Sequence, residues 1–135
     1  MKFQCIDHVV LTTKNLDKCL AFYRDLLGIP CSEQNGRWTI HLGESAIKIH
    51  CRPGEYQPAA GVPTAGSLDI CLKLRETEFP AGMALEIARN EIADAGWEIV
   101  CDIGERTGAN GPMESFYVRD PDGNLVEIMS CGIDD

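Results

Sequence analysis

The sequence has too few basic residues for a protein that binds nucleic acid. Its 135 residues include 12 Lys or Arg against 21 Asp or Glu, a formal net charge of −9. Nucleic-acid and anionic-membrane binding both depend on Lys and Arg, so this balance argues against either partner. No apolar run approaches the ~18 residues of a membrane span, and the first residues lack the pattern of a signal peptide. We therefore expect a cytoplasmic protein.

The seven cysteines lack the spacings of metal knuckles and redox motifs. No two of them form a Cys-x-x-Cys pair. An odd number of cysteines without such pairs predicts free thiols, buried as small apolar side chains in a reducing compartment. The composition, with 44% hydrophobic and 24% charged residues, is that of a folded chain. Its length fits one ordinary domain.

The first part of the chain predicts a strand, a helix and about three further strands. Asn15 is a helix N-cap residue that precedes apolar residues at helical spacing, and Gly28 is a typical helix stop. Asn35 and Gly36 predict a tight turn. Alternating apolar and polar residues follow that turn. The best-defined elements are strands over 5–13, 37–42 and 45–51, and a helix over 16–27.

The second part of the chain repeats this order of elements. Residues 52–66 are rich in Pro and Gly, which predicts a connector without regular structure. The expected elements after it are strands over 67–74, 97–101, 114–120 and 124–130, a helix over 81–95 and a loop over 105–111. We therefore predict an α+β fold of two βαβββ modules, 5–51 and 67–130, joined by the linker 52–66 within one domain, 1–135.

Two segments near the ends of the chain, IDHVVLTTKNLDKCLAFYRDLLGI and FYVRDPDGNLVEI, are specific when found together in this order. They resemble the vicinal oxygen chelate superfamily, which includes glyoxalase I, extradiol dioxygenases and fosfomycin-resistance proteins. The linker GEYQPAAGVPTAGSLDICL and the loop RTGANGP make the chain most similar to the glyoxalase-domain-containing, lactoylglutathione-lyase-like branch. The resemblance implies paired βαβββ modules that form a curled mixed sheet around a cavity. It also implies a divalent metal ion that binds vicinal oxygens of a small substrate, and pairing of chains as a homodimer.

The resemblance implies metal ligands in the first and last strands. His8 lies where the superfamily has its first ligand, and imidazole suits Zn, Fe and Ni. Glu127 lies where the family has its last-strand glutamate, and it would act both as a ligand and as the catalytic base. A carboxylate among apolar neighbours favours a bound cation. The pattern does not distinguish Zn, Ni, Mn and Fe.

The other two ligand positions depart from the family pattern. Aligning the repeat with itself places Lys48 opposite Glu127, and a protonated Lys cannot bind a metal. Ser67 stands where the second module would offer a histidine. His50 and Asp69 lie two residues after these positions, on the same strand faces. They could complete the metal shell with shifted geometry, or bind substrate or water; we predict His8, His50 and Glu127 as ligands and Asp69 as a substrate-binding residue.

Two further residues are candidates for binding the substrate. Arg106 lies in a loop that is common in this branch and could pair with a carboxylate, such as a glutathione adduct would offer. Tyr117 could take part in proton transfer if its strand face points inward. We expect His41 to face solvent and Cys71 to serve packing.

Three functions are compatible with these residues. The first is a metal-dependent lyase or isomerase of glyoxalase type, in which a carboxylate moves a proton between carbons. The second is an extradiol-type dioxygenase that binds Fe(II) through His8, His50 and Glu127. The third is a non-catalytic protein that sequesters a small molecule, as bleomycin-resistance proteins do. Lys48 and Ser67 favour the third, and the acidity of the chain would suit a cationic ligand.

Overall fold

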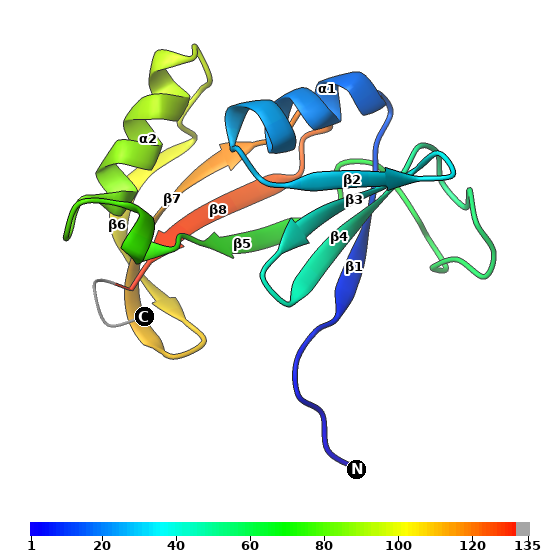
Figure 1. The fold of residues 1–135 in the computed structure, drawn as a ribbon, viewed down its shortest axis with the longest axis horizontal. Helices are drawn as coiled ribbons and strands as arrows, with labels where there is room; N and C mark the ends of the chain where they lie inside the picture. Colours follow the sequence, from blue (N-terminus) through cyan, green and yellow to red (C-terminus); the bar gives the residue numbers. More distant parts are fainter. Residues whose placement is uncertain (132–135) are drawn as a thin grey trace. The chain divides into compact units, whose positions relative to one another are not determined.

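The structure is a computed structural model that describes residues 1–131, and it divides into two units of the same topology (Figure 1). The first unit is Met1–Leu68 with Pro121–Gly123, and the second comprises Asp69–Asp120 and, within the described residues, 124–131. Each unit has a four-stranded mixed sheet, in the orders β1-β4-β3-β2 and β5-β8-β7-β6. The predicted α+β fold of two repeated modules is confirmed.

The elements of the first unit are β1 (His8–Thr12), α1 (Leu16–Leu20), η1 (Ala21–Leu26), β2 (Cys31–Gln34), β3 (Arg37–Leu42) and β4 (Ser45–His50). The elements of the second unit are β5 (Asp69–Lys73), η2 (Glu76–Glu78), α2 (Ala84–Asp94), β6 (Cys101–Gly108), β7 (Gly111–Arg119) and β8 (Leu125–Ser130). β1 and β4 pair in parallel, as do β5 and β8, and the other pairs are antiparallel.

The first helix begins and ends as the sequence predicts. The Asn15 side chain accepts a hydrogen bond from the backbone N–H of Lys18 at 3.0 Å, which caps α1. The helix then continues as the π-helical segment η1, in which the Leu27 N–H bonds to the Phe22 carbonyl. Gly28 ends it with a φ of 70°, a conformation that favours glycine.

The sheet of the first unit has one buried apolar face and one open polar face. The buried apolar side chains on its strands are Leu11, Ile40, Ile47 and Ile49. Residues that pair directly across neighbouring strands point to the same side of a sheet. Because Val10 pairs with Lys48 and Lys48 pairs with Thr39, these three side chains share the opposite face. That face carries the candidate site described below.

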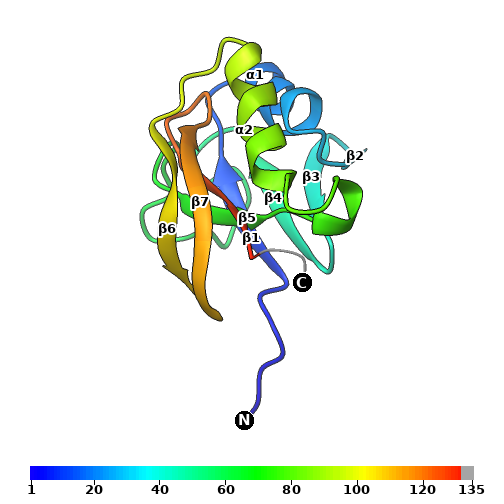
Figure 2. The same ribbon diagram turned by 90° about the vertical axis from the view of Figure 1, so that its left-hand side faces the viewer.

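The sheet of the second unit is covered on one face by α2. The helix packs against β7 and β8, and Figure 2 shows it beside β7. The strand residues buried on this face are Phe116, Val118, Val126 and Ile128. The alternate residues of the same strands, which include Tyr117 and Glu127, point to the other face.

Two elements of the second unit were predicted wrongly. The predicted strand 97–101 is irregular up to Val100, and the predicted loop 105–111 is mostly strand, because β6 runs over Cys101–Gly108. The strand accommodates its glycines through a bulge between Cys101 and Gly104. A Cβ atom at Gly104 would lie 2.5 Å from a guanidinium nitrogen of Arg106, so the glycine leaves room for that side chain.

The cysteines are free, as predicted, but the prediction that they are buried is wrong. Only Cys19 is buried and Cys31 is half-buried, whereas the other five are exposed. One of these is Cys71, which was expected to serve packing but lies exposed on a strand edge of the second sheet. The apolar interior of the two units is filled by larger aliphatic and aromatic side chains instead.

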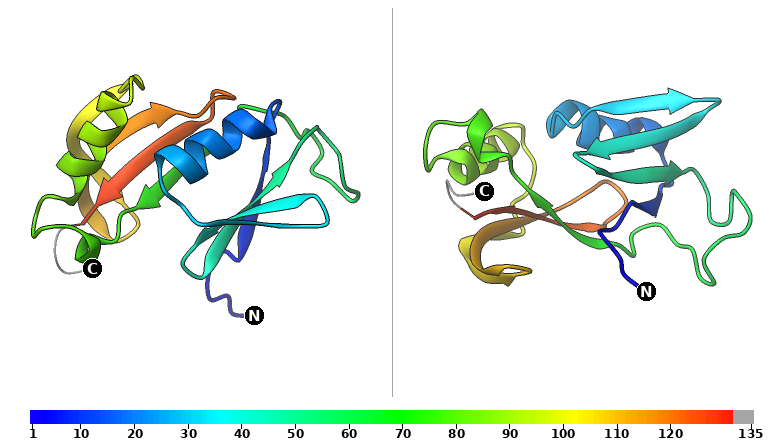
Figure 3. Two further views of the ribbon diagram at one scale, coloured as in Figure 1. Left: turned by 45° about the horizontal axis from the view of Figure 1, so that its top comes forward. Right: turned by 60° about the horizontal axis from the view of Figure 1, so that its bottom comes forward.

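The connector between β4 and β5 is a long loop without helix or strand, as predicted (Figure 3). The carboxyl end of this connector, at Gly66, lies in close contact with the turn Pro121–Gly123, which belongs to the same unit. Gly66, with a φ of 84°, approaches the carbonyl oxygen of Asp122 so closely that a Cβ atom would lie 2.5 Å from it. The Asp122 carboxylate in turn accepts hydrogen bonds from Thr13 Oγ1 at 2.5 Å and the Lys14 N–H at 2.9 Å.

No helix within residues 1–131 is both long enough and apolar enough to span a membrane.

Candidate functional site

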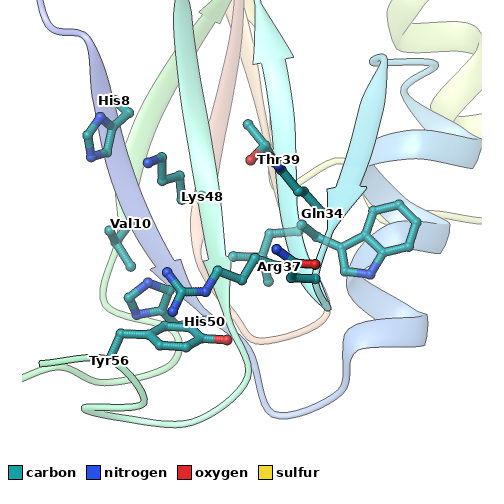
Figure 4. A pocket seen from close by; sticks show the side chains of 11 residues that line it. His8, Val10, Gln34, Arg37, Thr39, Lys48, His50 and Tyr56 are labelled. Atoms are coloured by element: carbon teal, nitrogen blue, oxygen red, sulfur yellow. The ribbon is translucent and has the colours of Figure 1, made fainter.

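A pocket of about 700 Å³ lies on the open face of the first sheet (Figure 4). His8 and Val10 line it from β1, Lys48 and His50 from β4, and Thr39 from β3. The residues that complete it are Gln34, Asn35, Arg37, Trp38, Ile49 and Tyr56. The pocket therefore collects two of the three histidines of the chain at one place.

The pocket is cationic although the chain as a whole is acidic. None of its lining residues is Asp or Glu, while Arg37 and Lys48 carry fixed positive charges. Within residues 1–131, neither of these two side chains forms an ion pair. The pocket therefore suits an anionic ligand, in contrast to the cationic ligand that the net charge of the chain had suggested.

One end of the pocket is a stacked cluster of three side chains. The guanidinium carbon of Arg37 lies 3.8 Å from the centroid of the Tyr56 ring, a close cation–π contact. The Tyr56 ring meets the His50 ring edge to face, with centroids 4.9 Å apart. Tyr56 comes from the connector, so the cluster joins that loop to β3 and β4. These contacts hold the guanidinium and the imidazole in fixed orientations.

His8 stands at the other end of the pocket. Its Nδ1 lies 2.8 Å from the carboxylate of Asp7, which leaves Nε2 as the nitrogen available to a ligand. A carboxylate behind one ring nitrogen is the usual arrangement of a metal-binding histidine. His8 Nε2 is therefore suited to bind a cation.

The two predicted histidine ligands lie far apart on the sheet. His8 pairs with Ala46, whereas His50 pairs with Thr12, four residues further along the strands. Four strand residues span roughly 13 Å. Figure 4 shows Val10 and Lys48 between the two imidazoles. This spacing does not support a single ion shared by His8 and His50, and their joint ligation stays a prediction.

Glu127 lies at the centre of a row of side chains across the second sheet. It pairs with Cys71 of β5 on one side and with Tyr117 of β7 on the other, and Tyr117 pairs with Cys101 of β6. The Ser115 hydroxyl donates a hydrogen bond of 2.5 Å to Oε2 of Glu127. Ser115 is fully buried and Glu127 half-buried, so this bond fixes the carboxylate in a partly desolvated position.

Burial and the Glu127 carboxylate together keep two neighbouring side chains protonated. Cys71 is exposed as a residue, but its thiol is partly shielded from water; this shielding, and then the charge of Glu127 and a hydrogen bond to it, raises the pKa of the Cys71 thiol to about 12. Burial and then Glu127 also raise the pKa of the Tyr117 phenol, against a smaller opposite effect of Arg106. Both neighbours are therefore hydrogen-bond donors at neutral pH.

The raised pKa of Cys71 predicts slow alkylation of an exposed thiol. Only the thiolate reacts, and at pH 8 a group with a pKa of about 12 holds roughly one part in 10⁴ as thiolate. Replacing Glu127 with Gln removes the negative charge, lowers the pKa of Cys71 and should speed its alkylation at pH 8 by at least about tenfold. Peptide mass spectrometry after timed iodoacetamide treatment measures this, with Cys5 as the internal reference. Equal rates for Cys71 and Cys5 in the unsubstituted protein would contradict the assignment.

Arg106, predicted to bind substrate, uses its guanidinium within β6 and β7. It donates hydrogen bonds to the Ser115 carbonyl at 3.3 Å, the Asp102 carbonyl at 3.2 Å and the Cys101 sulfur at 3.0 Å. Its guanidinium carbon also lies 5.3 Å from the centroid of the Tyr117 ring. These contacts bridge the bulge of β6 and orient Tyr117. Substrate binding by Arg106 stays a prediction.

Asp69 takes the same place in the second sheet that His8 takes in the first. The repeat places Lys48 of β4 and Glu127 of β8 at equivalent positions of the two units. The residues that pair with them in the neighbouring strands, Val10 of β1 and Cys71 of β5, are then equivalent too. His8 precedes Val10 by two residues, as Asp69 precedes Cys71. The strand register thus matches Asp69, rather than Ser67, to the first-strand histidine.

Within residues 1–131, no group of three or more His, Cys, Asp or Glu side chains is arranged to hold a metal ion. The potential donors are instead divided between the units: His8 and His50 in the first, Asp69 and Glu127 in the second. Lys48 adds a positive charge on β4, which pairs with β1, the strand that carries His8. A metal ion fits the chemistry of His8 and Glu127 individually, and their convergence on one ion stays a prediction.

Sequence reasoning missed Arg37 and Tyr56 as functional candidates. Arg37 could have been found, because it shares a strand face with Thr39 by the two-residue period. Tyr56 lies in an irregular connector, where no periodic signal predicts the direction of a side chain. His41 is exposed, as predicted, and its Nε2 lies 2.7 Å from the Ser32 hydroxyl.

Comparison with known families and proteins gives a consistent result. Residues 5–128 match the model of the Glyoxalase/Bleomycin resistance protein/Dioxygenase superfamily. The chain is 38% identical over 124 residues to virulence protein STM3117 of Salmonella typhimurium, covering 91% of this chain and 81% of that protein. It is 33% identical over 130 residues to glyoxalase domain-containing protein RDO1 of Mycosarcoma maydis, covering 96% of this chain and 70% of that protein.

Solved structures give the same picture. The crystal structure of STM3117 matches with a TM-score of 0.86 at 36% identity, covering 96% of this chain and 98% of that one. The crystal structure of lactoylglutathione lyase from Agrobacterium tumefaciens matches with a TM-score of 0.71 at 20% identity, covering 96% of each chain. At that identity the second match shows a shared fold only.

Proposed function

Because this chain belongs to the glyoxalase/bleomycin resistance protein/dioxygenase superfamily, we propose that it is an enzyme of glyoxalase type that acts on a small substrate with vicinal oxygens. The observation that carries the proposal is the setting of Glu127. Its carboxylate is half-buried, is fixed by Ser115 at 2.5 Å, and lies in one strand row with Cys71 and Tyr117.

Glu127 is the proposed general base. A carboxylate held by a hydrogen bond in a partly desolvated position can accept a proton from carbon and return it to the neighbouring carbon. Tyr117, whose raised pKa keeps the phenol protonated, would donate a hydrogen bond to the substrate oxygen that gains negative charge. Arg106 would act by positioning Tyr117 through their cation–π contact.

A divalent transition-metal ion is part of the proposal. His8 and Glu127 would hold it, with Asp69 as a further donor, and when bound the ion would polarise the vicinal oxygens of the substrate as a Lewis acid. The Asp7–His8 pair supports this role, since it leaves Nε2 of His8 available. His50 is assigned to the substrate instead, because it lies four residues from His8 in the strand register.

The test is turnover of the hemithioacetal of methylglyoxal and glutathione, followed by ultraviolet absorbance. Protein loaded in turn with Zn, Ni, Mn or Fe(II) should turn it over with at least one ion, and chelator should remove the activity. Inactivity with every ion would contradict the lyase. Iron-dependent oxygen uptake with a catechol would instead assign the extradiol-type reaction.

A non-catalytic binding protein is the second candidate. Lys48, at the position equivalent to Glu127, supports it because an ammonium group neither binds a metal nor accepts a proton. This candidate predicts ligand binding without turnover and without stoichiometric metal. The homodimer that the resemblance implies, and the cytoplasmic location expected from the sequence, belong to both proposals.

A further inference from the structure

A second pocket in the same unit adjoins the pocket described above. The second pocket has a volume of about 300 Å³ and shares Val10 and His50 with the first. These two residues therefore stand at the boundary between two differently lined spaces. A ligand that fills both spaces must pass them.

The larger pocket contains two positively charged side chains, Arg37 and Lys48, that form no ion pair within residues 1–131. Arg37 is stacked on Tyr56, which leaves the edge of its guanidinium for hydrogen bonds in the plane of the group. Lys48 extends from the centre of the same face, as Figure 4 shows. With no Asp or Glu in the lining, an oxyanion of the ligand would be the acceptor for both side chains.

The smaller pocket is mostly apolar. Its remaining lining residues are Thr12, Gly54, Pro58, Ala59, Ala60, Val62, Pro63, Thr64, Ser67 and Leu68. None of them carries a charge, and nearly all come from the connector. Val62 is 82% exposed and Val10 is 40% exposed, which is unusual for large aliphatic side chains. An apolar group bound here would cover these surfaces.

We propose that the two adjoining pockets bind a small molecule with an oxyanion at one end and an apolar substituent at the other. The oxyanion, a carboxylate, pairs with Arg37 and Lys48, and the substituent extends past His50 and Val10 onto the connector. This inference rests on the proposed function, because it names the class of substrate on which the proposed enzyme would act.

The test compares five probes by isothermal titration calorimetry with the full chain: hexanoate, butanoate, acetate, hexanamide and hexylammonium. Hexanoate should bind at least about tenfold more tightly than acetate, which lacks the chain, and than hexanamide, which lacks the charge. Affinity should rise about fourfold for each methylene added from butanoate to hexanoate. Hexylammonium should bind most weakly. Equal affinity for hexanoate and hexanamide, equal affinity for hexanoate and acetate, or no binding of hexanoate would overturn the proposal.

Variants locate the two ends of the bound probe. Arg37→Met and Lys48→Met should each weaken hexanoate at least about tenfold and leave hexanamide unchanged. Lys2→Met, which removes an exposed charge before β1, is the matched control and should change neither affinity. Val10→Ser should reduce the preference for hexanoate over acetate. If the Lys2 and Lys48 variants lose hexanoate affinity equally, the effect is one of net charge and the pocket assignment fails.

The Glu127→Gln variant separates this inference from the proposed enzyme. Glu127 belongs to the second unit and does not line either pocket. Hexanoate should bind this variant as tightly as the unsubstituted protein, whether or not the protein turns over the hemithioacetal. If both proteins bind hexanoate and neither turns over the hemithioacetal, the proposed ligand class is upheld and the proposed enzyme is rejected. If the unsubstituted protein turns over the hemithioacetal but does not bind hexanoate, the enzyme is upheld and the ligand class is rejected.

Discussion

Glu127→Gln should lower turnover of the hemithioacetal by about 10²–10⁴-fold while the protein stays folded. The substitution keeps the size of the side chain and its ability to accept a hydrogen bond from Ser115. It removes the negative charge, and with it the capacity to take a proton from carbon. Steady-state kinetics under saturating metal measure the effect, which should fall on kcat more than on KM because a base acts in the transition state.

The matched control is Glu91→Gln, which removes one carboxylate from an exposed position on α2. Its kcat should equal that of the unsubstituted protein. Circular dichroism and thermal melting should show both variants folded. Turnover by Glu127→Gln within threefold of the unsubstituted protein would refute the role of this carboxylate as the base.

His8→Ala should reduce bound metal from about one ion per chain to less than one tenth, and should abolish turnover with it. His8 offers Nε2 from an imidazole whose Nδ1 is already paired with Asp7, and alanine has no donor to replace it. Elemental analysis after dialysis against a metal-buffered solution measures the content. The exposed position of His8 at the start of β1 predicts little loss of stability.

Two histidine controls make this result specific. His41→Ala removes an exposed imidazole from β3 and should leave metal content unchanged. His50→Ala should also leave it unchanged, because His50 lies at the far end of the pocket from His8. Loss of metal in His50→Ala but not in His8→Ala would show that the ion is held at the Tyr56 end of the pocket instead.

The sequence predicted the fold well where short-range signals are strong. The Asn15 cap, the Gly28 stop and the alternation of residues 37–42 depend on local backbone preferences, and the structure confirms each of them. β6 was missed because its glycines suggested a loop. In the structure the Arg106 guanidinium lies directly against Gly104, a contact that no local pattern reveals.

The candidate site could be predicted only in part, for a similar reason. The two-residue period correctly placed Lys48 and His50 on one strand face, but it could not show which charges gather there. The pairing of Arg37 with Tyr56 depends on the path of an irregular connector. The net charge of the chain was misleading, because the acidic residues lie outside the pocket while its lining is cationic.

The central claim is that His8 and Glu127 bind the same divalent ion. A crystal structure of the metal-loaded protein, with the ion located by its anomalous scattering, tests it most directly. We expect one fully occupied ion with His8 Nε2 and a Glu127 oxygen each at about 2.0–2.2 Å. An ion bonded to only one of these two groups, or no ion in crystals grown with an excess of metal, would contradict it.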